Sequence, residues 1–403
     1  GHNAQLVFGD IQHERAHQKT DHMRVLRCCV QRMFAGATVE LASKLATFSN
    51  TGGITYTGAG TIIRNAPWNG SRTLVGAAGG TIDLSVGGRL IVAGGQTRLS
   101  NSAKTDWTSN QGSLTVSNGA SFDLYDSGTA PTESQADTNV YIDALDGNGR
   151  IWRTLGGNSD ASTIVMGVGN TSGKFSGSIS DAGTGVGNIN LEKQGSGTQI
   201  LAGLNGYEGT TTISAGTLQV GVGGAMGTIG SGNITNNANL VINRANSSSE
   251  LLVYGQVSGT GDLTVERSGG VRFEQSVTQG NVVLKDSGNN RTIDFWQNVD
   301  LDGLTVENGT GNYNVSFIGS SNTIGGATTF GNAGKLTLGN DAGDSITFTD
   351  GVTATATFNR DVSGTVSVTN GGINLAGGGV TAFKHKVTLG RAGSGVIVLS
   401  AAN

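Results

Sequence analysis

Large apolar residues recur at a fixed interval along the second half of this 403-residue chain. Phe273, Phe295 and Phe317 follow one another at equal intervals of about 22 residues. The same interval separates the members of two further sets, Leu284 and Val306, and Ile213, Thr235 and Val257. A fixed period of about 20 to 50 residues is typical of repeat architectures, in which every repeat packs on its neighbours.

The residues between these positions predict short strands and tight turns. Alternating runs such as SLTVS (113–117), DLTVE (262–266) and KVTLG (386–390) are bounded by Gly, Asn, Asp or Ser. Glycine accounts for 68 residues and proline for only two. This glycine content, together with the many β-branched residues, excludes helical repeats.

We therefore expect an all-β fold over residues 49–403, namely a right-handed parallel β-helix (β-solenoid) of roughly 22-residue coils. Stacked coils place equivalent residues about 4.8 Å apart, so the three phenylalanines are expected to form an internal ladder. A sandwich or propeller of short strands is the alternative fold.

Residues 1–48 differ from the rest of the chain. They contain four of the five histidines, both cysteines and few glycines. Apolar residues at helical spacing predict an amphipathic helix over roughly residues 10–35, and they are Met23, Leu26, Val30, Met33 and Phe34. We interpret residues 1–48 as a short helical segment that either caps the first coil or docks onto a partner.

This segment includes an H-E-x-x-H sequence, the zinc-binding pattern of many proteases. His13 and His17 are four residues apart, with Glu14 beside them. A metzincin needs a third histidine six residues after the second, with a glycine between them. Here His22 follows after five residues and Thr20 occupies the glycine position. The sequence therefore predicts neither a protease nor a metal site here.

Two other patterns fall short of a metal or redox site. The run LGNDAGDSI (338–346) matches half of the calcium-binding repeat of secreted β-rolls, which needs tandem copies. Cys28 and Cys29 are adjacent, which fits neither a zinc knuckle nor a redox motif. We interpret the run as an Asn/Asp turn and the cysteines as idle thiols, and we expect no cofactor.

A stretch near the middle of the chain carries a family signature. Residues 183–221 read GTGVGNINLEKQGSGTQILAGLNGYEGTTTISAGTLQVG. This stretch resembles the passenger-associated transport repeat of bacterial autotransporters, with Gly206 where that family has threonine. The matching residues are Leu191, Lys193, Gly195, Gly197, Thr198, Leu201, Gly203, Asn205, Tyr207, Gly209, Thr212, Ile213, Gly216, Thr217, Leu218, Val220 and Gly221.

The resemblance implies an extracellular or cell-surface right-handed β-helix, from a family that is often adhesive or structural. It fits the physical roles of the residues, because glycines suit corners at positive φ and the apolar positions can point inward. A surface fibre, sheath or adhesin of this kind gains affinity from area and multivalency rather than from one pocket.

Some right-handed β-helices instead cleave polysaccharides, with carboxylates or basic residues clustered on one face of adjacent coils. The acidic candidates for such a site are Asp123, Asp143, Asp146 and Asp160. They are scattered around turns, and we find no charged column at the 22-residue period. The aromatic candidates for lining a sugar-binding face are Trp107, Trp152 and Tyr141. The sequence favours a non-enzymatic rod, with a polysaccharide lyase or glycan-binding β-helix as the alternative.

The ends of a solenoid expose unpaired backbone groups that can template further strands. At the C-terminal end, the run from Val396 to Leu399 is apolar, with no charged or helical cover after it. Either the solenoid continues beyond this sequence, or this end pairs with another copy and gives head-to-tail fibres. The residues expected at such an assembly interface are Leu26, Val30, Met33, Phe34, Val396, Ile397, Val398 and Leu399.

Charge and hydropathy restrict the partners further. The net charge is −4 and no basic patch with interleaved aromatics is present, so nucleic acid is not an expected partner. No run of about 18 apolar residues occurs, so no transmembrane helix is expected. The expected partners are other copies of this chain, or glycans and proteins of a surface.

Overall fold

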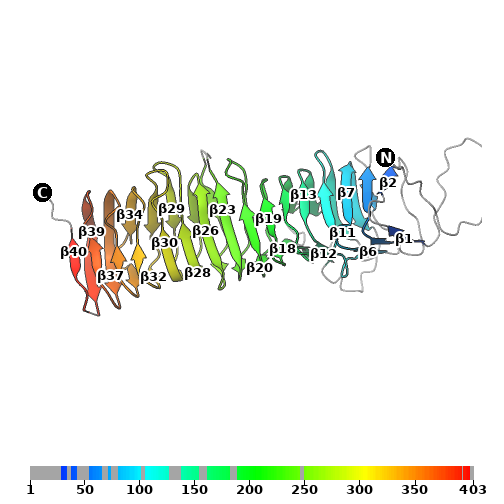
Figure 1. Cartoon of the computed structure of the whole chain (residues 1–403). Coiled ribbons are helices and arrows are strands. Elements are labelled where there is room, and N and C mark those ends of the chain that lie inside the picture. The colour runs from blue at the N-terminus through cyan, green and yellow to red at the C-terminus, as the bar shows by residue number, and fades with distance from the viewer. Residues whose placement is uncertain are drawn as a thin grey trace, which may run out of the picture.

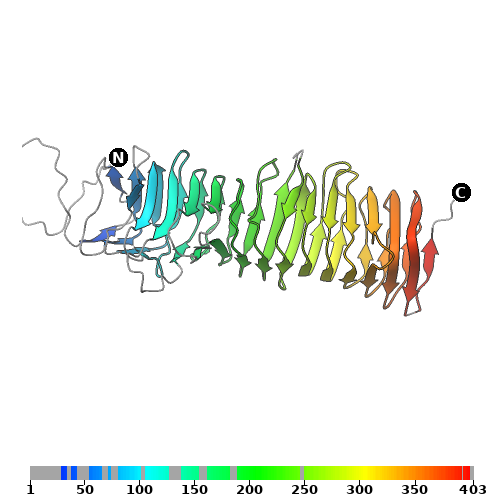
Figure 2. The same ribbon diagram turned by 180° about the vertical axis from the view of Figure 1, so that it is seen from behind.

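The fold is known from a computed structural model, which describes residues 29–33, 38–42, 54–65, 71–73, 80–100, 105–126, 138–153, 161–181, 188–245, 249–392 and 394–399. Within these residues the chain forms 40 strands and no helix. The strands stack side by side along one rod, from β1 (Cys29–Met33) near one end to β40 (Ile397–Leu399) at the other (Figures 1 and 2). The expected all-β solenoid is confirmed.

Each coil contributes strands to as many as three faces of the rod, and strands pair in parallel with those of the next coil. The first face contains β1, β3 (Ile54–Gly58), β6 (Gly80–Leu84), β9 (Thr105–Asp106), β12 (Thr138–Ile142), β15 (Ser162–Met166), β18 (Ile189–Lys193), β20 (Thr211–Ile213), β22 (Ile234–Asn236), β25 (Val257–Ser258), β32 (Ser321–Ile324) and β35 (Ser345–Phe348).

The second face contains β2 (Thr38–Ala42), β4 (Thr61–Asn65), β7 (Arg89–Gly94), β10 (Ser113–Val116), β13 (Leu145–Gly147), β16 (Gly173–Phe175), β19 (Thr198–Leu201), β21 (Thr217–Val220), β23 (Asn239–Arg244), β26 (Asp262–Ser268), β33 (Thr328–Thr329), β36 (Val352–Thr353), β38 (Ile373–Leu375) and β40. The third face contains β5 (Ser71–Thr73), β8 (Gln96–Ser100), β11 (Ser121–Asp126), β14 (Arg150–Arg153), β17 (Ser178–Asp181), β24 (Leu251–Val253), β27 (Val271–Phe273), β29 (Thr292–Phe295), β31 (Asn314–Phe317) and β34 (Lys335–Leu338).

Four long strands continue from one face to the next. β28 (Val277–Leu284) and β30 (Val299–Val306) connect the first face to the second. β37 (Asn359–Val368) and β39 (Thr381–Arg391) connect the third face to the first. Parallel crossovers are almost always right-handed, so the right-handed sense of the coil stays a prediction that agrees with this connectivity.

The length of a coil varies along the rod. Phe273 pairs with Phe295 and Phe295 with Phe317, so the step between these coils has the expected length. Elsewhere the step is longer, since Leu114 pairs with Leu145. Turn insertions between strands absorb such differences without disturbing the ladder, because loops at the surface tolerate changes in length.

One predicted column is wrong by a single residue. Ile213 pairs with Asn236 rather than with Thr235, and Val257 pairs with Ile234. The coil here is one residue longer than the coil between Phe273 and Phe295. A slip of one residue turns a strand side chain to the opposite face. The other predicted pair, Leu284 with Val306, is confirmed.

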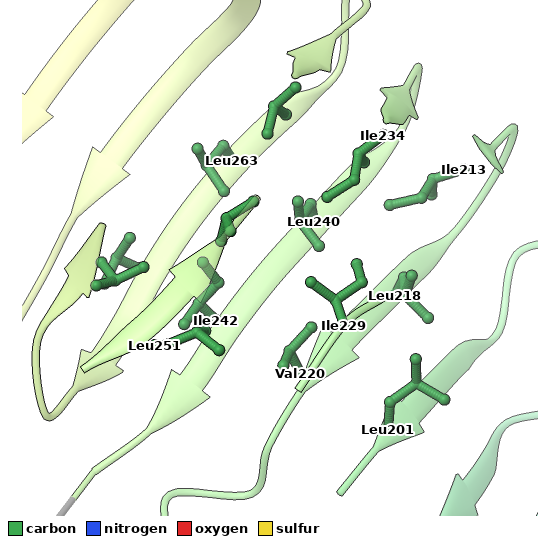
Figure 3. Close-up of a cluster of buried hydrophobic side chains, with 14 of the residues drawn as sticks. Leu201, Ile213, Leu218, Val220, Ile229, Ile234, Leu240, Ile242, Leu251 and Leu263 are labelled. Carbon is green, nitrogen blue, oxygen red and sulfur yellow. The ribbon is translucent and has the colours of Figure 1, made fainter. Parts of the chain in front are cut away.

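The core runs the length of the rod as columns of inward-facing side chains. Alternate residues of most strands are buried, as in β23, where buried positions alternate with one exposed and two half-buried positions. Figure 3 shows one such column, in which Leu218, Leu240 and Leu263 of successive coils point into the interior. The three stacked phenylalanines form another, with ring centroids 5.0 and 4.9 Å apart. The predicted phenylalanine ladder is therefore confirmed.

The expected N-terminal helix is not supported. Residues Cys29–Met33, inside the predicted helical range, form strand β1 and pair in parallel with β3. The helical spacing of a few apolar residues does not exclude a strand, and the edge of β3 offers this segment a row of backbone hydrogen bonds. The other residues of the predicted helix lie outside the described residues. The division of the chain at residue 48 stays a prediction, while strand pairing already extends back to Cys29.

Candidate functional site

A buried lysine occupies a corner of the coil in the segment that carries the family signature. Lys193 is fully buried at the end of β18. Its Nζ donates hydrogen bonds to the carbonyl oxygens of Gln194, Gly195 (2.8 Å) and Ala215 (3.3 Å). Burial lowers the pKa of Lys193, and the carboxylate of Asp143 opposes this effect. These contacts fix the corner between two coils, so this lysine holds the fold together.

Two further signature residues also hold neighbouring coils together. The Oδ1 atom of Asn205 accepts the N–H of Ile179 at 3.1 Å, and its Nδ2 donates to the carbonyl oxygen of Thr228 at 2.8 Å. The hydroxyl of Tyr207 lies 2.7 Å from Oγ1 of Thr211. Burial raises the pKa of Tyr207 to about 12. The polar members of the signature are thus satisfied inside the solenoid.

The structure does not bring the predicted acidic candidates together as a catalytic group. Asp123 is fully buried and pairs with Arg98 at 3.0 Å. Asp143 accepts two backbone N–H groups from the next coil, both at 2.9 Å. Asp146 accepts one such group at 3.0 Å. These three carboxylates connect neighbouring coils, and Asp160 lies outside the described residues.

The structure brings two of the three predicted aromatic candidates together and places the third elsewhere. Trp107 is 1% exposed and packs edge-on against Phe122, with ring centroids 6.3 Å apart. Trp107 and Tyr141 line one pocket together with Thr105, Asp106, Thr108 and Asn139. Trp152 lies on the third face, where the guanidinium of Arg150 sits 4.3 Å from its ring centroid. A sugar-binding role for these three residues stays a prediction.

The calcium-like run forms a turn. The Oδ2 atom of Asp344 accepts the backbone N–H groups of Asn340 and Asp341 at 2.7 and 2.8 Å. This carboxylate therefore stabilises the local loop, and Oδ1 of Asp341 accepts the N–H of Gly343 at 3.2 Å, as in an Asx turn. In the described part of the chain, no group of three or more His, Cys, Asp or Glu residues could hold a metal ion. The H-E-x-x-H sequence lies outside the described residues.

The residues predicted for end-to-end assembly lie at both ends of the rod. Val30 and Met33 belong to β1, whereas Leu26 and Phe34 lie outside the described residues. At the other end, β40 pairs in parallel with β38. The side chains there are exposed, with fractions of 67% for Val396, 37% for Ile397, 40% for Val398 and 42% for Leu399. The interface itself stays a prediction.

The third face carries a charged and aromatic cluster that sequence reasoning missed. We call it the third-face patch, and it consists of Glu250, Tyr254, Arg272, Glu274, Asp294 and Trp296. Arg272 lies at its centre, with ion pairs to Glu250 (3.0 Å), Asp294 (3.6 Å) and Glu274 (3.7 Å). The guanidinium carbon of Arg272 is 4.2 Å from the ring centroid of Trp296.

The patch is open to solvent at its aromatic members. Trp296 is 40% exposed and Tyr254 is 53% exposed, while the four charged side chains are between 13% and 28% exposed. Burial raises the pKa of Glu250. Arg272 lowers this pKa, whereas the nearby carboxylates of Asp294 and Glu274 raise it further. Strands β24, β27 and β29 carry the patch on three successive coils.

The sequence did contain a signal for this patch. Glu250, Arg272 and Asp294 follow one another at the same interval as the stacked phenylalanines, and Glu274 and Trp296 are separated by that interval too. In the structure, however, Leu252 rather than Glu250 pairs with Arg272, so this column contains two charged residues, Arg272 and Asp294, between Leu252 and Ser316. Residues of opposite charge lie together in the patch, so a search for clustered like charges passes over it.

Known proteins share both the repeat and part of the sequence of this chain. The family described as Passenger-associated-transport-repeat matches residues 191–220. Over 109 residues the chain is 39% identical to the "Adhesin BmaC autotransporter" of Brucella suis biovar 1 (strain 1330). This match covers 27% of the chain and 3% of the relative, so the chain spans a small part of the relative's length. No solved structure matches.

The parallel solenoid, the repeat and the relative together support similarity of this chain to an autotransporter passenger with a β-helix. The repeat that the sequence resembles is thereby confirmed, at residues 191–220. The same similarity to an autotransporter adhesin supports a location outside the cell, at its surface. The part of the chain that the structure describes has no helix suited to crossing a membrane.

Proposed function

We propose that this passenger is a non-enzymatic adhesive rod at the bacterial surface. The observation that carries this proposal is the 39% identity, over 109 residues, to a protein named as an adhesin. The fold supports it, because a stack of coils presents outward side chains at a spacing of about 4.8 Å along each face. Such a surface binds by many weak contacts, whose combined strength exceeds that of any one of them.

The surroundings of the aspartates that the sequence offered as catalytic candidates support a binding role for the chain rather than a hydrolytic one. Asp123, Asp143 and Asp146 are committed to an ion pair or to backbone N–H groups. A glycosidase instead needs two carboxylates facing each other across a substrate bond. Incubating the purified chain with a panel of polysaccharides tests this directly. Chain shortening or an unsaturated sugar product would overturn the non-enzymatic proposal.

Surface display tests the adhesive role. The chain would be fused to a heterologous translocator in a non-adherent bacterium, and adherence to cultured host cells and to immobilised matrix proteins would be counted. We expect adherence well above that of bacteria displaying an unrelated passenger of similar length. Adherence equal to that control, with surface exposure verified by antibody, would contradict the proposal.

A further inference from the structure

The third-face patch contains two aromatic side chains whose exposure to solvent does not stabilise the fold. Buried aromatic rings such as Phe273, Phe295 and Phe317 stabilise the interior, whereas Trp296 and Tyr254 leave much of their rings in water. Exposed aromatic side chains surrounded by polar groups are typical of recognition surfaces, because they offer a large rigid contact area.

The register of the coils sets the spacing of the two rings. Val253 pairs with Phe273, and Phe273 with Phe295. Tyr254 and Trp296 directly follow the first and the last of these residues, so they lie two coils apart along the rod. Two coils correspond to about 9 to 10 Å. This is close to the length of a disaccharide unit in an extended β-linked glycan.

The polar members of the patch supply hydrogen bonds of the kind that sugar hydroxyls need. Ionised carboxylates only accept hydrogen bonds, and a guanidinium only donates them. The Oδ1 atom of Asp294 is buried and finds no donor among the described residues, while its Oδ2 atom accepts the Nε1–H of Trp296. Asp294 therefore holds the ring of Trp296 in place, because its unpaired oxygen is out of reach of a ligand at the surface. The acceptor that a ligand can reach is the carboxylate of Glu274, which is 24% exposed and lies in register between Tyr254 and Trp296.

The charges of the patch restrict its ligand. With all groups ionised, three carboxylates and one guanidinium give 1 − 3 = −2, which disfavours sulfated or other acidic glycans. A cationic peptide is disfavoured for another reason. The protein's own Arg272 already occupies the position between the carboxylates and the ring of Trp296, where a ligand cation would bind.

We propose that the third-face patch binds an uncharged glycan chain, with pyranose rings stacked on Tyr254 and on the part of the Trp296 ring that Arg272 leaves exposed, and with hydroxyls donating to Glu274. This inference rests on the proposed adhesive function and names its ligand class. The site is non-catalytic: it holds the glycan along the rod axis, and neighbouring coils extend the contact.

Calorimetric titration with cellotetraose and N-acetylchitotetraose tests the proposal on the whole chain, at low and at high salt. We expect at least one of them to bind with little salt dependence, and Trp296→Ala or Tyr254→Ala to weaken that binding roughly tenfold. Phe358→Ala is the matched control, because Phe358 is 66% exposed and lies outside the patch. Circular dichroism would verify that each variant folds.

Three results would overturn the proposal: no binding of either tetrasaccharide, equal binding by Trp296→Ala and the unaltered chain, or binding of poly-lysine alone with steep salt dependence. Its failure is distinguishable from failure of the adhesive function. If the displayed chain adheres to cells but binds neither tetrasaccharide, only the glycan site is wrong. If it binds a tetrasaccharide without adhering to cells, the adhesive function is wrong instead.

Discussion

At the scale of single residues, the stacked phenylalanines show how the repeat stabilises itself. Phe273, Phe295 and Phe317 are fully buried, and their rings are nearly parallel, with interplanar angles of 8° and 1°. Each ring packs on its counterpart in the next coil, so the middle one contacts both neighbours. Aromatic pairs of this kind contribute beyond the area that they bury.

Phe295→Ala is expected to lower the free energy of unfolding by about 3–5 kcal/mol, because it leaves a cavity between two other rings. Urea denaturation followed by circular dichroism would measure the loss. Phe358→Ala, which removes an exposed ring, should change stability by no more than about 0.5 kcal/mol. Similar losses for both variants would show that the stack is not a source of stability.

The buried hydroxyl of Tyr207 predicts a loss of stability at high pH. Its pKa is raised from 10.0 to about 12 in the fold, chiefly by burial. The stabilisation is fully present below pH 10 and is lost as the pH rises through about 12, with a total loss of about 3 kcal/mol. The free energy of unfolding, measured by urea denaturation, is expected to fall less between pH 9 and pH 11 for Tyr207→Phe than for the unaltered chain. Equal differences would mean that Tyr207 titrates normally.

At the scale of elements, the corners of the coils set the tightest constraints. A Cβ atom added to Gly203 would collide with the carbonyl oxygen of Gly177 and lie 2.6 Å from that of Ser176. Around Gly206, by contrast, no atom lies within 4 Å of such a Cβ position. Two glycines three residues apart in the same signature therefore have different physical roles.

Gly203→Ala is expected to destabilise the protein by about 1–3 kcal/mol or more, because the backbones of two coils must move apart. Gly206→Thr restores the residue that the family carries and should be neutral or stabilising by about 0.5–1 kcal/mol, since glycine has the larger loss of backbone entropy. Thermal unfolding of both variants measures the contrast. A destabilised Gly206→Thr together with an unaffected Gly203→Ala would contradict this account of the corner.

At the scale of the whole molecule, the rod is a one-dimensional stack of coils (Figure 1). Each coil pairs with its neighbours, and a few buried amides reach one coil further, as Gln199 does to the backbone of Leu145. Stability in such a stack is approximately a sum of coil terms and of interfaces between coils. Core side chains in the middle of the rod are covered on both sides. The apolar side chains of β40 are exposed instead, and an exposed apolar strand favours association with another chain.

End-to-end assembly would appear in negative-stain electron microscopy as filaments whose axial repeat is near the length of one rod. We expect their number to rise with protein concentration, and Ile397→Lys to abolish them by placing a charge on the exposed strand. Val222→Lys is the control, because Val222 is 45% exposed, against 37% for Ile397, but follows β21 in the middle of the rod. Single rods at every concentration would refute assembly through this end.

The sequence by itself determined the class of fold and the repeat. Alternating strand residues, glycine turns and the regular step of the phenylalanines are local or nearest-neighbour features, so they can be read without knowing how distant segments meet. The signature at residues 191–220 could be recognised for the same reason. The burial of Lys193 and Tyr207 within this signature could not be predicted from the sequence, because neither residue type has a preference for the interior.

Only the tertiary structure decided the register and the surface. The coil after Ile213 is one residue longer than the coils between the stacked phenylalanines, so Asn236 rather than Thr235 pairs with Ile213. The turns between the strands determine this difference in length. Pairing with β3 decided that residues Cys29–Met33 are a strand. The third-face patch depends on both effects, because its charges and rings belong to three coils and meet only when those coils are in register. Side chains that are distant in sequence acquire a common site through stacking, which no local pattern encodes.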